Sequence, residues 1–210
     1  MISHEHQFIF IHVPKTGGTS IEEALGLNGP RHNTARQYKE LFPELRERYY
    51  SFAFVRNPWD RILSLYLYRQ QFRRLETARS TEFKEWLVER ASLAFVNDHE
   101  ALNREFAPEY QVGTSVRHDP EGWRVKFDSA FRMLADQDGQ LAVDFVGRFE
   151  RLQSDFDQVC GKLGIPGREL PHCNRTFRRP YWFYYDAESR RIVEEIFSKD
   201  IEYFGYRFGE

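Results

Sequence analysis

A glycine-rich loop between a strand pattern and a helix pattern is the feature that most constrains the fold. Residues 7–13 read QFIFIHV, a continuous apolar run of strand-forming residues, and Pro14–Ser20 read PKTGGTS. A continuous run, unlike an alternating one, is typical of a strand covered on both faces in a parallel sheet. Apolar residues then recur at helical spacing up to Gly26, which has the position of a helix stop. The chain therefore opens with a strand, a glycine loop and a helix.

The same unit is repeated further along the chain. Residues 51–55 read SFAFV, which is a second apolar strand pattern. Asn57 and Pro58 come next, and these residue types favour the N-cap and the first position of a helix. The helical pattern then continues to about Phe72.

A third unit lies in the second half of the chain. Its strand is predicted at 141–146 (LAVDFV), with a turn at Gly147 and a helix that Ser154 caps and Gly164 ends. Three such units predict an α/β fold. We expect a three-layer, P-loop-like arrangement in which helices flank a central parallel sheet, with right-handed connections between its strands.

The remaining pattern concerns domain organisation. Two further helices are predicted at Glu82–Phe95 and Ala187–Ser198 from their apolar spacing. A chain of 210 residues fits one large domain, so we expect a single domain over residues 1–210. Residues 97–140 form the least regular stretch, and a long irregular segment in a domain is often functional. We therefore assign residues 97–140 to an insertion that binds the acceptor.

Charge and composition exclude several classes of protein. The net charge is −2, with 30 basic and 32 acidic residues, so the chain lacks the basic excess of a general nucleic-acid binder. Any anion site must therefore be local. The sequence holds no apolar run long enough to span a membrane, and its first residues lack the pattern of a signal peptide. We expect a cytoplasmic location, in which Cys160 and Cys173 stay reduced.

The glycine loop has the chemistry of an anion site. It precedes a helix, whose N-terminus presents backbone N–H groups and a positive dipole. Gly17 and Gly18 allow the backbone to approach an oxygen atom closely, and Lys15 adds a positive charge. The order of residues excludes the nucleoside-triphosphate P-loop, in which the lysine follows the glycines. A ligand-free turn between a strand and a helix remains the alternative.

A second anion-binding pattern starts at the end of the second predicted strand. Arg56 follows this strand, and its guanidinium can bind a phosphate through two parallel hydrogen bonds. Ser64 lies eight residues further on, two turns into the helix, where it can meet the same phosphate. We expect Arg61, Ser64 and Tyr68 to share one helix face. A strand-end salt bridge for Arg56 and a solvent-facing hydroxyl for Ser64 are the alternatives.

Both patterns resemble the donor-binding elements of sulfotransferases. Residues 12–20 (HVPKTGGTS) are similar to the 5′-phosphosulfate loop of that family, in the form found in carbohydrate O-sulfotransferases. Residues 54–64 (FVRNPWDRILS) are similar to the family's 3′-phosphate element. Residues 144–152 resemble a later strand and turn of these enzymes, in which an aromatic residue contacts adenine, and Phe149 holds that position.

The resemblance implies a function and a set of ligands. It implies transfer of a sulfuryl group from 3′-phosphoadenosine-5′-phosphosulfate (PAPS) to an acceptor hydroxyl, with adenosine 3′,5′-bisphosphate (PAP) as the second product. We expect a carbohydrate acceptor and no metal ion, because the loop itself supplies positive charge. The residues implied in donor binding are Pro14, Lys15, Thr16, Gly17, Gly18, Thr19, Ser20, Arg56, Ser64 and Phe149.

The predicted catalytic residues are Lys15 and His32. The resemblance implies that Lys15 stabilises the negative charge on the oxygen that leaves with the nucleotide. Positively charged groups stabilise the transition state of phosphoryl transfer in the same way. Sulfotransferases of this type use a His or Glu after the phosphate-loop helix as general base, and His32 is the one histidine between the two motifs. A surface histidine is the alternative reading of His32. His12 is expected to be structural, and His172 could approach the site from the C-terminal segment.

Three readings of the function stay open from the sequence. The first is the sulfotransferase, the second a kinase-like nucleotide-dependent phosphotransferase, and the third a binding module for nucleotides or glycans without turnover. Scattered arginines could form a groove for an anionic sugar chain, although solvated surface arginines explain them equally well. They are Arg31, Arg73, Arg74, Arg117, Arg178 and Arg179.

Overall fold

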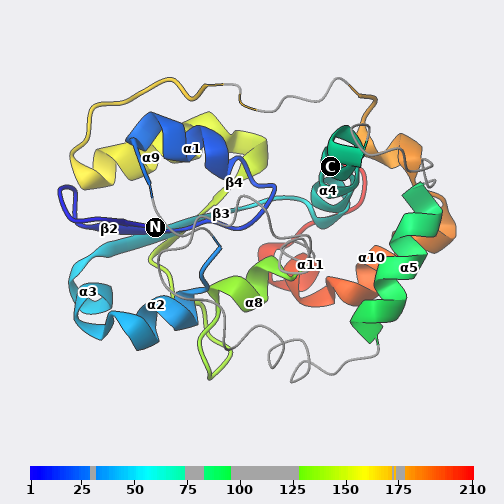
Figure 1. The fold of residues 1–210 in the computed structure, drawn as a ribbon, viewed down its shortest axis with the longest axis horizontal. Helices are drawn as coiled ribbons and strands as arrows, with labels where there is room; N and C mark the ends of the chain where they lie inside the picture. Colours follow the sequence, from blue (N-terminus) through cyan, green and yellow to red (C-terminus); the bar gives the residue numbers. More distant parts are fainter. Residues whose placement is uncertain (29–31, 74–82, 96–127, 172, 174–177) are drawn as a thin grey trace.

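The computed structural model describes residues 1–28, 32–73, 83–95, 128–171, 173 and 178–210. Within these residues the strands form one sheet in the order β1-β2-β3-β4 (Figure 1). Strands β2, β3 and β4 are parallel, and β1 pairs with β2 in the antiparallel sense. This confirms the predicted α/β fold with a mainly parallel sheet between helices. The strands are β1 (Ile2–Ser3), β2 (Phe8–Ile11), β3 (Tyr50–Val55) and β4 (Phe145–Arg148).

The described helices fall into two groups. The group that flanks the sheet consists of α1 (Gly18–Leu25), α2 (Ala35–Leu41), α3 (Pro43–Arg48), α8 (Ala130–Leu134) and α9 (Leu152–Leu163). The group beyond the carboxyl end of β3 consists of α4 (Pro58–Arg73), α5 (Phe83–Phe95), α10 (Ala187–Ile196) and α11 (Ser198–Phe204). Two short 3-10 helices, η1 (Phe149–Arg151) and η2 (Tyr181–Tyr184), lie in the connections.

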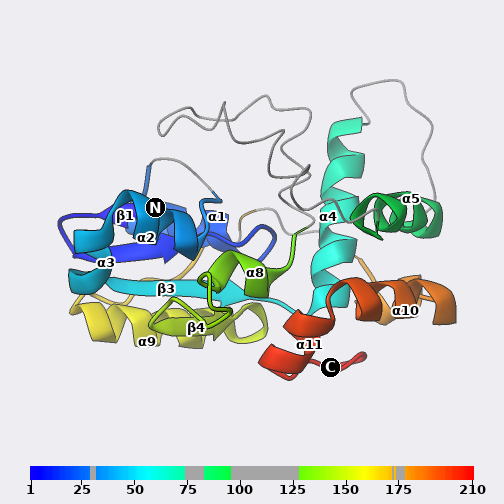
Figure 2. The same ribbon diagram turned by 90° about the horizontal axis from the view of Figure 1, so that it is seen from below.

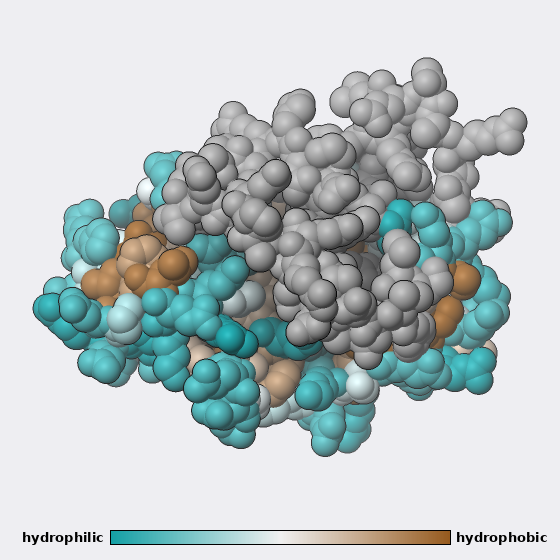
Figure 3. Space-filling view, turned by 60° about the horizontal axis from the view of Figure 1, so that its bottom comes forward, coloured by the Kyte–Doolittle hydropathy of each residue, from teal (hydrophilic) through white to brown (hydrophobic). Residues whose placement is uncertain are grey.

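Alternate residues of the strands are buried on opposite faces of the sheet. Phe10 and Phe52 pack in one core cluster, under α1 and α9, whereas Ile9 and Ala53 pack in another, with α2 and α8. Figure 1 shows these helix pairs on the two sides of the strands. Burial on both faces explains why the strands read as continuous apolar runs. The side chains left on the described surface are mostly hydrophilic on the face shown in Figure 3, with small apolar areas.

A third core cluster lies among the helices beyond β3. Trp59 of α4, Trp86 of α5 and Phe197 are each almost fully buried in it. Figure 2 shows α4 standing at a steep angle to β3, with α5 and α10 on its far side. Asn57 caps α4 as predicted, because its side-chain oxygen accepts a hydrogen bond from the Trp59 N–H at 3.2 Å. The start of α4 is thereby fixed directly after the strand end that carries Arg56.

The third predicted strand is displaced in the structure. The prediction placed it at 141–146 with a turn at Gly147, but β4 spans Phe145–Arg148, so Gly147 lies within the strand. The Asp144 carboxylate accepts hydrogen bonds from the N–H and hydroxyl of Ser51 at 2.7 and 2.6 Å, which fixes where pairing with β3 begins. A Cβ on Gly147 would lie 2.4 Å from the Phe54 ring. The glycine is therefore needed for strand packing and not for a turn.

The predicted helices are confirmed, with changes at their ends. α9 starts at Leu152, and the hydroxyl of Ser154 donates to the Arg151 carbonyl instead of capping the helix. Gly164 ends α9 with a left-handed φ of 66°, as expected. The helix predicted to run from 187 to 198 ends at Ile196, and α11 follows it.

Some features were not predicted or lie outside the described residues. Helices α2 and α3 were missed, although a capping box joins Thr34 and Gln37 at the start of α2 and could have been recognised. Most of the predicted insertion, residues 97–127, lies outside the described part of the chain. None of the described helices is long and apolar enough to cross a membrane.

Candidate functional site

The glycine loop has the backbone shape that an anion site requires. Gly17 is the N-cap residue of α1 with a left-handed φ of 85°, and a Cβ there would lie 2.6 Å from Leu152 of α9. A Cβ on Gly18 would lie 2.1 Å from the His12 ring. The Thr16 hydroxyl donates to the Val13 carbonyl at 2.7 Å and closes the turn. The first N–H groups of α1, which have no partner within the helix, are thus presented at the loop.

A buried His–Glu pair supports the loop from behind. His12 Nδ1 lies 2.5 Å from the Glu22 carboxylate, and the two residues are only 6% and 3% exposed. Glu22 belongs to α1, so the pair connects the end of β2 to the helix across the loop. The structural role predicted for His12 is confirmed by this contact. Its partner Glu22 was not predicted.

His32 is attached to the strand segment that enters the loop. Its Nδ1 lies 3.0 Å from the carbonyl oxygen of His12, and the two rings are 4.6 Å apart. A carbonyl oxygen only accepts hydrogen bonds, so Nδ1 is the donor in this contact. His32 has a left-handed φ of 67° and is half-buried. The structure thus places this histidine beside the residue that enters the loop.

Arg56 joins three parts of the site. It is 8% exposed, and its Nε and Nη2 donate to Asp60 Oδ2 at 2.9 and 2.7 Å. Its Nη1 donates to the carbonyl oxygen of Lys15 at 3.1 Å, and its guanidinium lies 3.8 Å from the centre of the Phe149 ring. The pKa of Arg56 is lowered, chiefly by burial, and Asp60 opposes this shift. Because the ordinary pKa of arginine is so high, the guanidinium stays charged. The salt bridge considered as the alternative role of Arg56 is therefore present.

One face of α4 connects the two anion-binding patterns. Asp60, Ser64 and Tyr68 are spaced four residues apart and share this face, which spans about 12 Å along the helix. Asp60 binds Arg56 at one end, and Lys15 Nζ lies 3.9 Å from the centre of the Tyr68 ring at the other. Ser64 is half-buried between them. Lys15 and Arg56 are thus held at opposite ends of one helix face.

Arg61 has the spacing expected for the face of Ser64 and Tyr68, but it is buried at 1% exposure, whereas those two residues are half-buried. Its Nη2 donates to the Asp128 carbonyl at 2.6 Å and lies 3.7 Å from the Asp200 carboxylate. The spacing of four residues between Arg56 and Asp60 was a readable signal for this pair.

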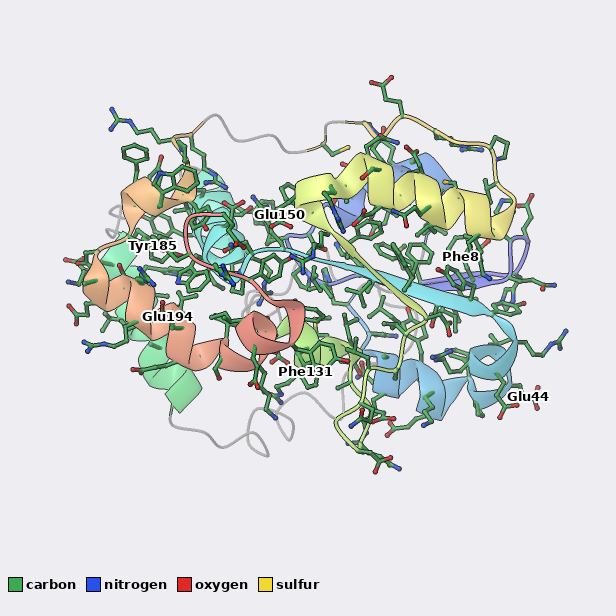
Figure 4. The ribbon with its side chains drawn as sticks, turned by 180° about the vertical axis from the view of Figure 1, so that it is seen from behind. Phe8, Glu44, Phe131, Glu150, Tyr185 and Glu194 are labelled. Carbon is green, nitrogen blue, oxygen red and sulfur yellow. The ribbon has the colours of Figure 1, made fainter. Side chains whose placement is uncertain are left out.

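Phe149 and Glu150 complete the site at the end of β4. Phe149 lies against Gly17 as well as Arg56, since a Cβ on Gly17 would be 3.3 Å from its ring. Glu150 accepts a hydrogen bond from the Asn57 N–H at 2.7 Å and lies where β4 meets the start of α4 (Figure 4). A cavity of about 440 Å³ adjoins these residues. It is lined by Asn57, Arg148, Glu150, Arg151, Tyr206 and Glu210.

The described residues bring most of the predicted site together. The loop, Arg56 and Phe149 are in contact near the start of α4, and His32 contacts His12 just before the loop. Ser64 lies about two turns further along α4. His172 lies outside the described residues. Within the part of the chain that the structure describes, no three His, Cys, Asp or Glu side chains gather as a metal site would require.

These contacts bring the glycine loop, Arg56 and Phe149 together beside the α/β sheet, and comparison with known proteins gives the family of the chain. The model of the sulfotransferase family matches residues 1–207. The chain therefore belongs to the sulfotransferase family, which confirms the family resemblance inferred from its two motifs.

Individual relatives are distant. The chain is 24% identical to carbohydrate sulfotransferase 14 of Danio rerio over 230 residues, which cover 98% of this chain and 61% of that protein. It is also 24% identical to carbohydrate sulfotransferase 14 of Mus musculus, with 98% and 59% covered. An uncharacterized protein of Archaeoglobus fulgidus is 28% identical over 61% of this chain and 75% of its own length. The chain thus spans about three-fifths of the carbohydrate sulfotransferases it matches, and no solved structure matches it.

Proposed function

We propose that this protein transfers a sulfuryl group from PAPS to a hydroxyl of a carbohydrate. The observation that carries the proposal is the shared face of α4, which holds Lys15 at one end and Arg56 at the other, with Ser64 between. A donor with anionic groups on both its 5′ and 3′ sides needs two such cationic positions at a fixed separation. Membership of the sulfotransferase family and the similarity to carbohydrate sulfotransferases support the same reaction.

Each end of the site has a proposed part of the donor. The P-loop-like segment Pro14–Ser20 binds the 5′-phosphosulfate through its backbone N–H groups, with Thr16 contributing its amide because its hydroxyl closes the turn. Arg56 and Ser64 bind the 3′-phosphate. One face of the Phe149 ring is covered by the Arg56 guanidinium, so adenine would contact its other face.

The proposed chemistry is an in-line displacement at sulfur. The acceptor hydroxyl oxygen attacks the sulfuryl group, its proton passes to His32 Nε2, and the bond from sulfur to the bridging oxygen of the nucleotide breaks. The products are a sulfate ester and PAP. Negative charge builds up on the bridging oxygen, and Lys15 with the loop N–H groups stabilises it. His32 suits the task because, in a neutral ring whose Nδ1 donates to the His12 carbonyl, Nε2 is the nitrogen that accepts a proton.

Product analysis by mass spectrometry tests this function. The protein is incubated with PAPS, or in parallel with ATP, and a panel of glycans, lipids and phenols. A sulfated glycan made only with PAPS supports the proposal. A phosphorylated product made with ATP would replace it with the kinase-like reading, and nucleotide binding without any product would leave a binding module. The cytoplasmic location stays a prediction from the sequence.

A further inference from the structure

Lys15 and Arg56 are held to α4 by contacts of different kinds. Arg56 donates from two nitrogens to the Asp60 carboxylate, at 2.9 and 2.7 Å. The Nζ of Lys15 lies 3.9 Å from the centre of the Tyr68 ring. A carboxylate offsets the charge of its partner, whereas an aromatic ring attracts a cation through its quadrupole and carries no net charge. The contact with Tyr68 therefore holds the ammonium without neutralising it.

Tyr68 meets Lys15 because of where α4 starts and how it stands. The helix begins at Pro58, directly after the strand end that carries Arg56, and stands at a steep angle to β3 (Figure 2). Tyr68 lies ten residues beyond Pro58, which corresponds to about 15 Å along the helix axis. Asp60 lies two turns nearer to the strand end. The helix thus fixes the separation between the ring that holds Lys15 and the carboxylate that holds Arg56.

The backbone of Lys15 adds to this placement. Its φ of 68° lies in the left-handed region, which is unfavourable for a residue with a Cβ. The carbonyl oxygen of Lys15 accepts a hydrogen bond from Arg56 Nη1 at 3.1 Å, which fixes the peptide that follows. A strained backbone persists where the surrounding structure stabilises it. The loop thus has a lysine where glycine would be less strained, and this lysine is the residue that reaches the Tyr68 ring.

A held ammonium suits the transfer of an anionic group. A lysine side chain is long and flexible, so fixing its ammonium at one place costs conformational entropy. A contact that is already made before the reaction reduces the part of this cost that falls on the transition state. Positive charge placed in advance is also what stabilises a developing oxyanion. The Tyr68 ring can therefore preorganise Lys15 and leave its charge available to the donor.

We propose that Tyr68 is a positioning residue, whose ring holds the Lys15 ammonium at the glycine loop through a cation–π contact. The inference rests on the proposed function, since it assigns the held ammonium to the oxygen that leaves with the nucleotide. Tyr68 acts through Lys15 and is not itself a catalytic residue. The ring carries this role, so the Tyr68 hydroxyl is not needed for it.

A double-mutant cycle on turnover tests the inference. Tyr68→Leu removes the ring and should lower turnover about 3- to 30-fold, the range expected for loss of a cation–π contact. PAP affinity, measured by calorimetry, should change little, because PAP lacks the transferred group. Tyr68→Phe should keep near wild-type turnover, since its ring also attracts a cation. In a Lys15→Ala background, Tyr68→Leu should have no further effect, because the contact is already lost.

Tyr50 provides a matched control. It makes a contact of the same kind outside the candidate site, with Lys162 Nζ 5.9 Å from the centre of its ring. Tyr50 is the first residue of β3, at the opposite end of the strand from Arg56. Tyr50→Leu should therefore leave turnover unchanged, with or without Lys15.

NMR measures the contact itself, in the absence of donor and acceptor. Protons above the face of an aromatic ring are shifted upfield, so the Hε protons of Lys15 should resonate upfield of an ordinary lysine. The signal is assigned by its loss in Lys15→Ala. The upfield shift should persist in Tyr68→Phe and vanish in Tyr68→Leu. A wild-type protein without this shift would have no such contact in solution, and the inference would be overturned.

The outcomes separate this inference from the proposed function. If wild-type protein makes no sulfated product, the proposed function is wrong, and the role of Tyr68 in transfer is overturned with it. If wild-type protein is active but Tyr68→Leu has the same effect with and without Lys15, only the inference is wrong. An unchanged turnover of Tyr68→Leu would also contradict it. A higher turnover would contradict it too, because the ring would then draw Lys15 away from the donor.

Discussion

The two ends of the candidate site, the glycine loop and the arginine cluster, differ in the groups that form them. The loop end, Pro14–Ser20, is one contiguous stretch whose shape comes from two glycines packed against the His12 ring and Leu152. The arginine end, made of Arg56, Asp60 and Arg178, is assembled from two distant segments by ion pairs. Every residue except proline supplies a backbone N–H, whereas a side-chain charge is lost when the residue is replaced by an uncharged one.

The comparison indicates what each end contributes. In the proposed function the loop end lies where the transferred group would bind, so its interactions suit a transition state. The arginine end would bind a phosphate that does not react, so its interactions serve donor affinity. Changes at the loop end should therefore lower turnover, and changes at the arginine end should weaken binding. The following predictions test this division, from the largest expected effect to the smallest.

The largest effect is expected for the proposed base beside the loop end. His32→Ala should lower turnover by about 10²- to 10⁴-fold, the usual contribution of a general base, and leave PAP affinity nearly unchanged. The wild-type rate should rise with pH as an imidazole loses its proton, and this limb should vanish in the variant. Steady-state rates against pH at saturating acceptor measure both. His4→Ala is the control, because His4 contacts Tyr49, which is not part of the candidate site.

Near-full turnover of His32→Ala would show that another group accepts the proton. His12 is then a poor substitute, because it is buried against Glu22. A carboxylate from residues 97–140 would be the next candidate to test.

Replacing Lys15 should lower turnover much more than donor affinity, as expected for the loop end. Lys15→Ala removes a charge aimed at the leaving oxygen, so turnover should fall by about 10²- to 10³-fold. PAP affinity should change much less, because the bisphosphate product lacks the transferred group. Single-turnover rates and calorimetry separate the two quantities, with Lys39→Ala on α2 as the control. Equal losses of rate and affinity would contradict a transition-state role for Lys15.

Replacing Arg56 should lower donor affinity much more than turnover. Arg56→Ala should weaken PAP binding by roughly 2–4 kcal/mol, because it removes a buried charged partner and leaves Asp60 less well paired. Adenosine 5′-phosphate should be nearly indifferent to the change, and turnover at saturating donor should fall little. Calorimetric titration of both ligands measures the difference. An equal effect on both ligands would remove Arg56 from the 3′ side of the donor.

The division between the two ends also explains how much the sequence could predict. Local patterns predicted β2, β3 and the capped start of α4, because Asn57 and the apolar runs act on their immediate neighbours. The start of β4 was predicted too early, because the apolar run at 141–146 has the residue pattern of a buried strand over its whole length. Its true position depends on contacts of Asp144 with Ser51, 93 residues away in the sequence.

The same reasoning applies to the site. The loop end could be predicted almost completely, since its glycines, lysine and helix start are contiguous. At the arginine end only Arg56 and Ser64 were predicted, because they belong to one motif. Arg178 lies 118 residues from Asp60, and no local pattern connects them. A site held by long-range ion pairs therefore becomes visible only when the fold is known.

The smallest effect concerns the glycine that shapes the loop end. Gly17→Ala should lower the free energy of unfolding by about 1–2 kcal/mol from its left-handed backbone alone. The new Cβ would add a clash with Leu152, at 2.6 Å. Gly26→Ala is a matched control, since Gly26 also has a left-handed φ, of 63°, but nothing lies within 4 Å of its Cβ position. Denaturant unfolding should therefore show a larger loss for Gly17→Ala than for Gly26→Ala.

The two glycine variants also separate backbone strain from the shape of the anion site. Gly26 lies at the far end of α1, so Gly26→Ala should keep wild-type affinity for both adenosine nucleotides. Gly17→Ala should weaken both nucleotides alike, because each has a 5′ group at the loop, whereas Arg56→Ala weakens only the one with a 3′-phosphate. If Gly17→Ala instead weakened PAP alone, the loop would serve the 3′ side of the donor. The assignment of the two ends would then be reversed.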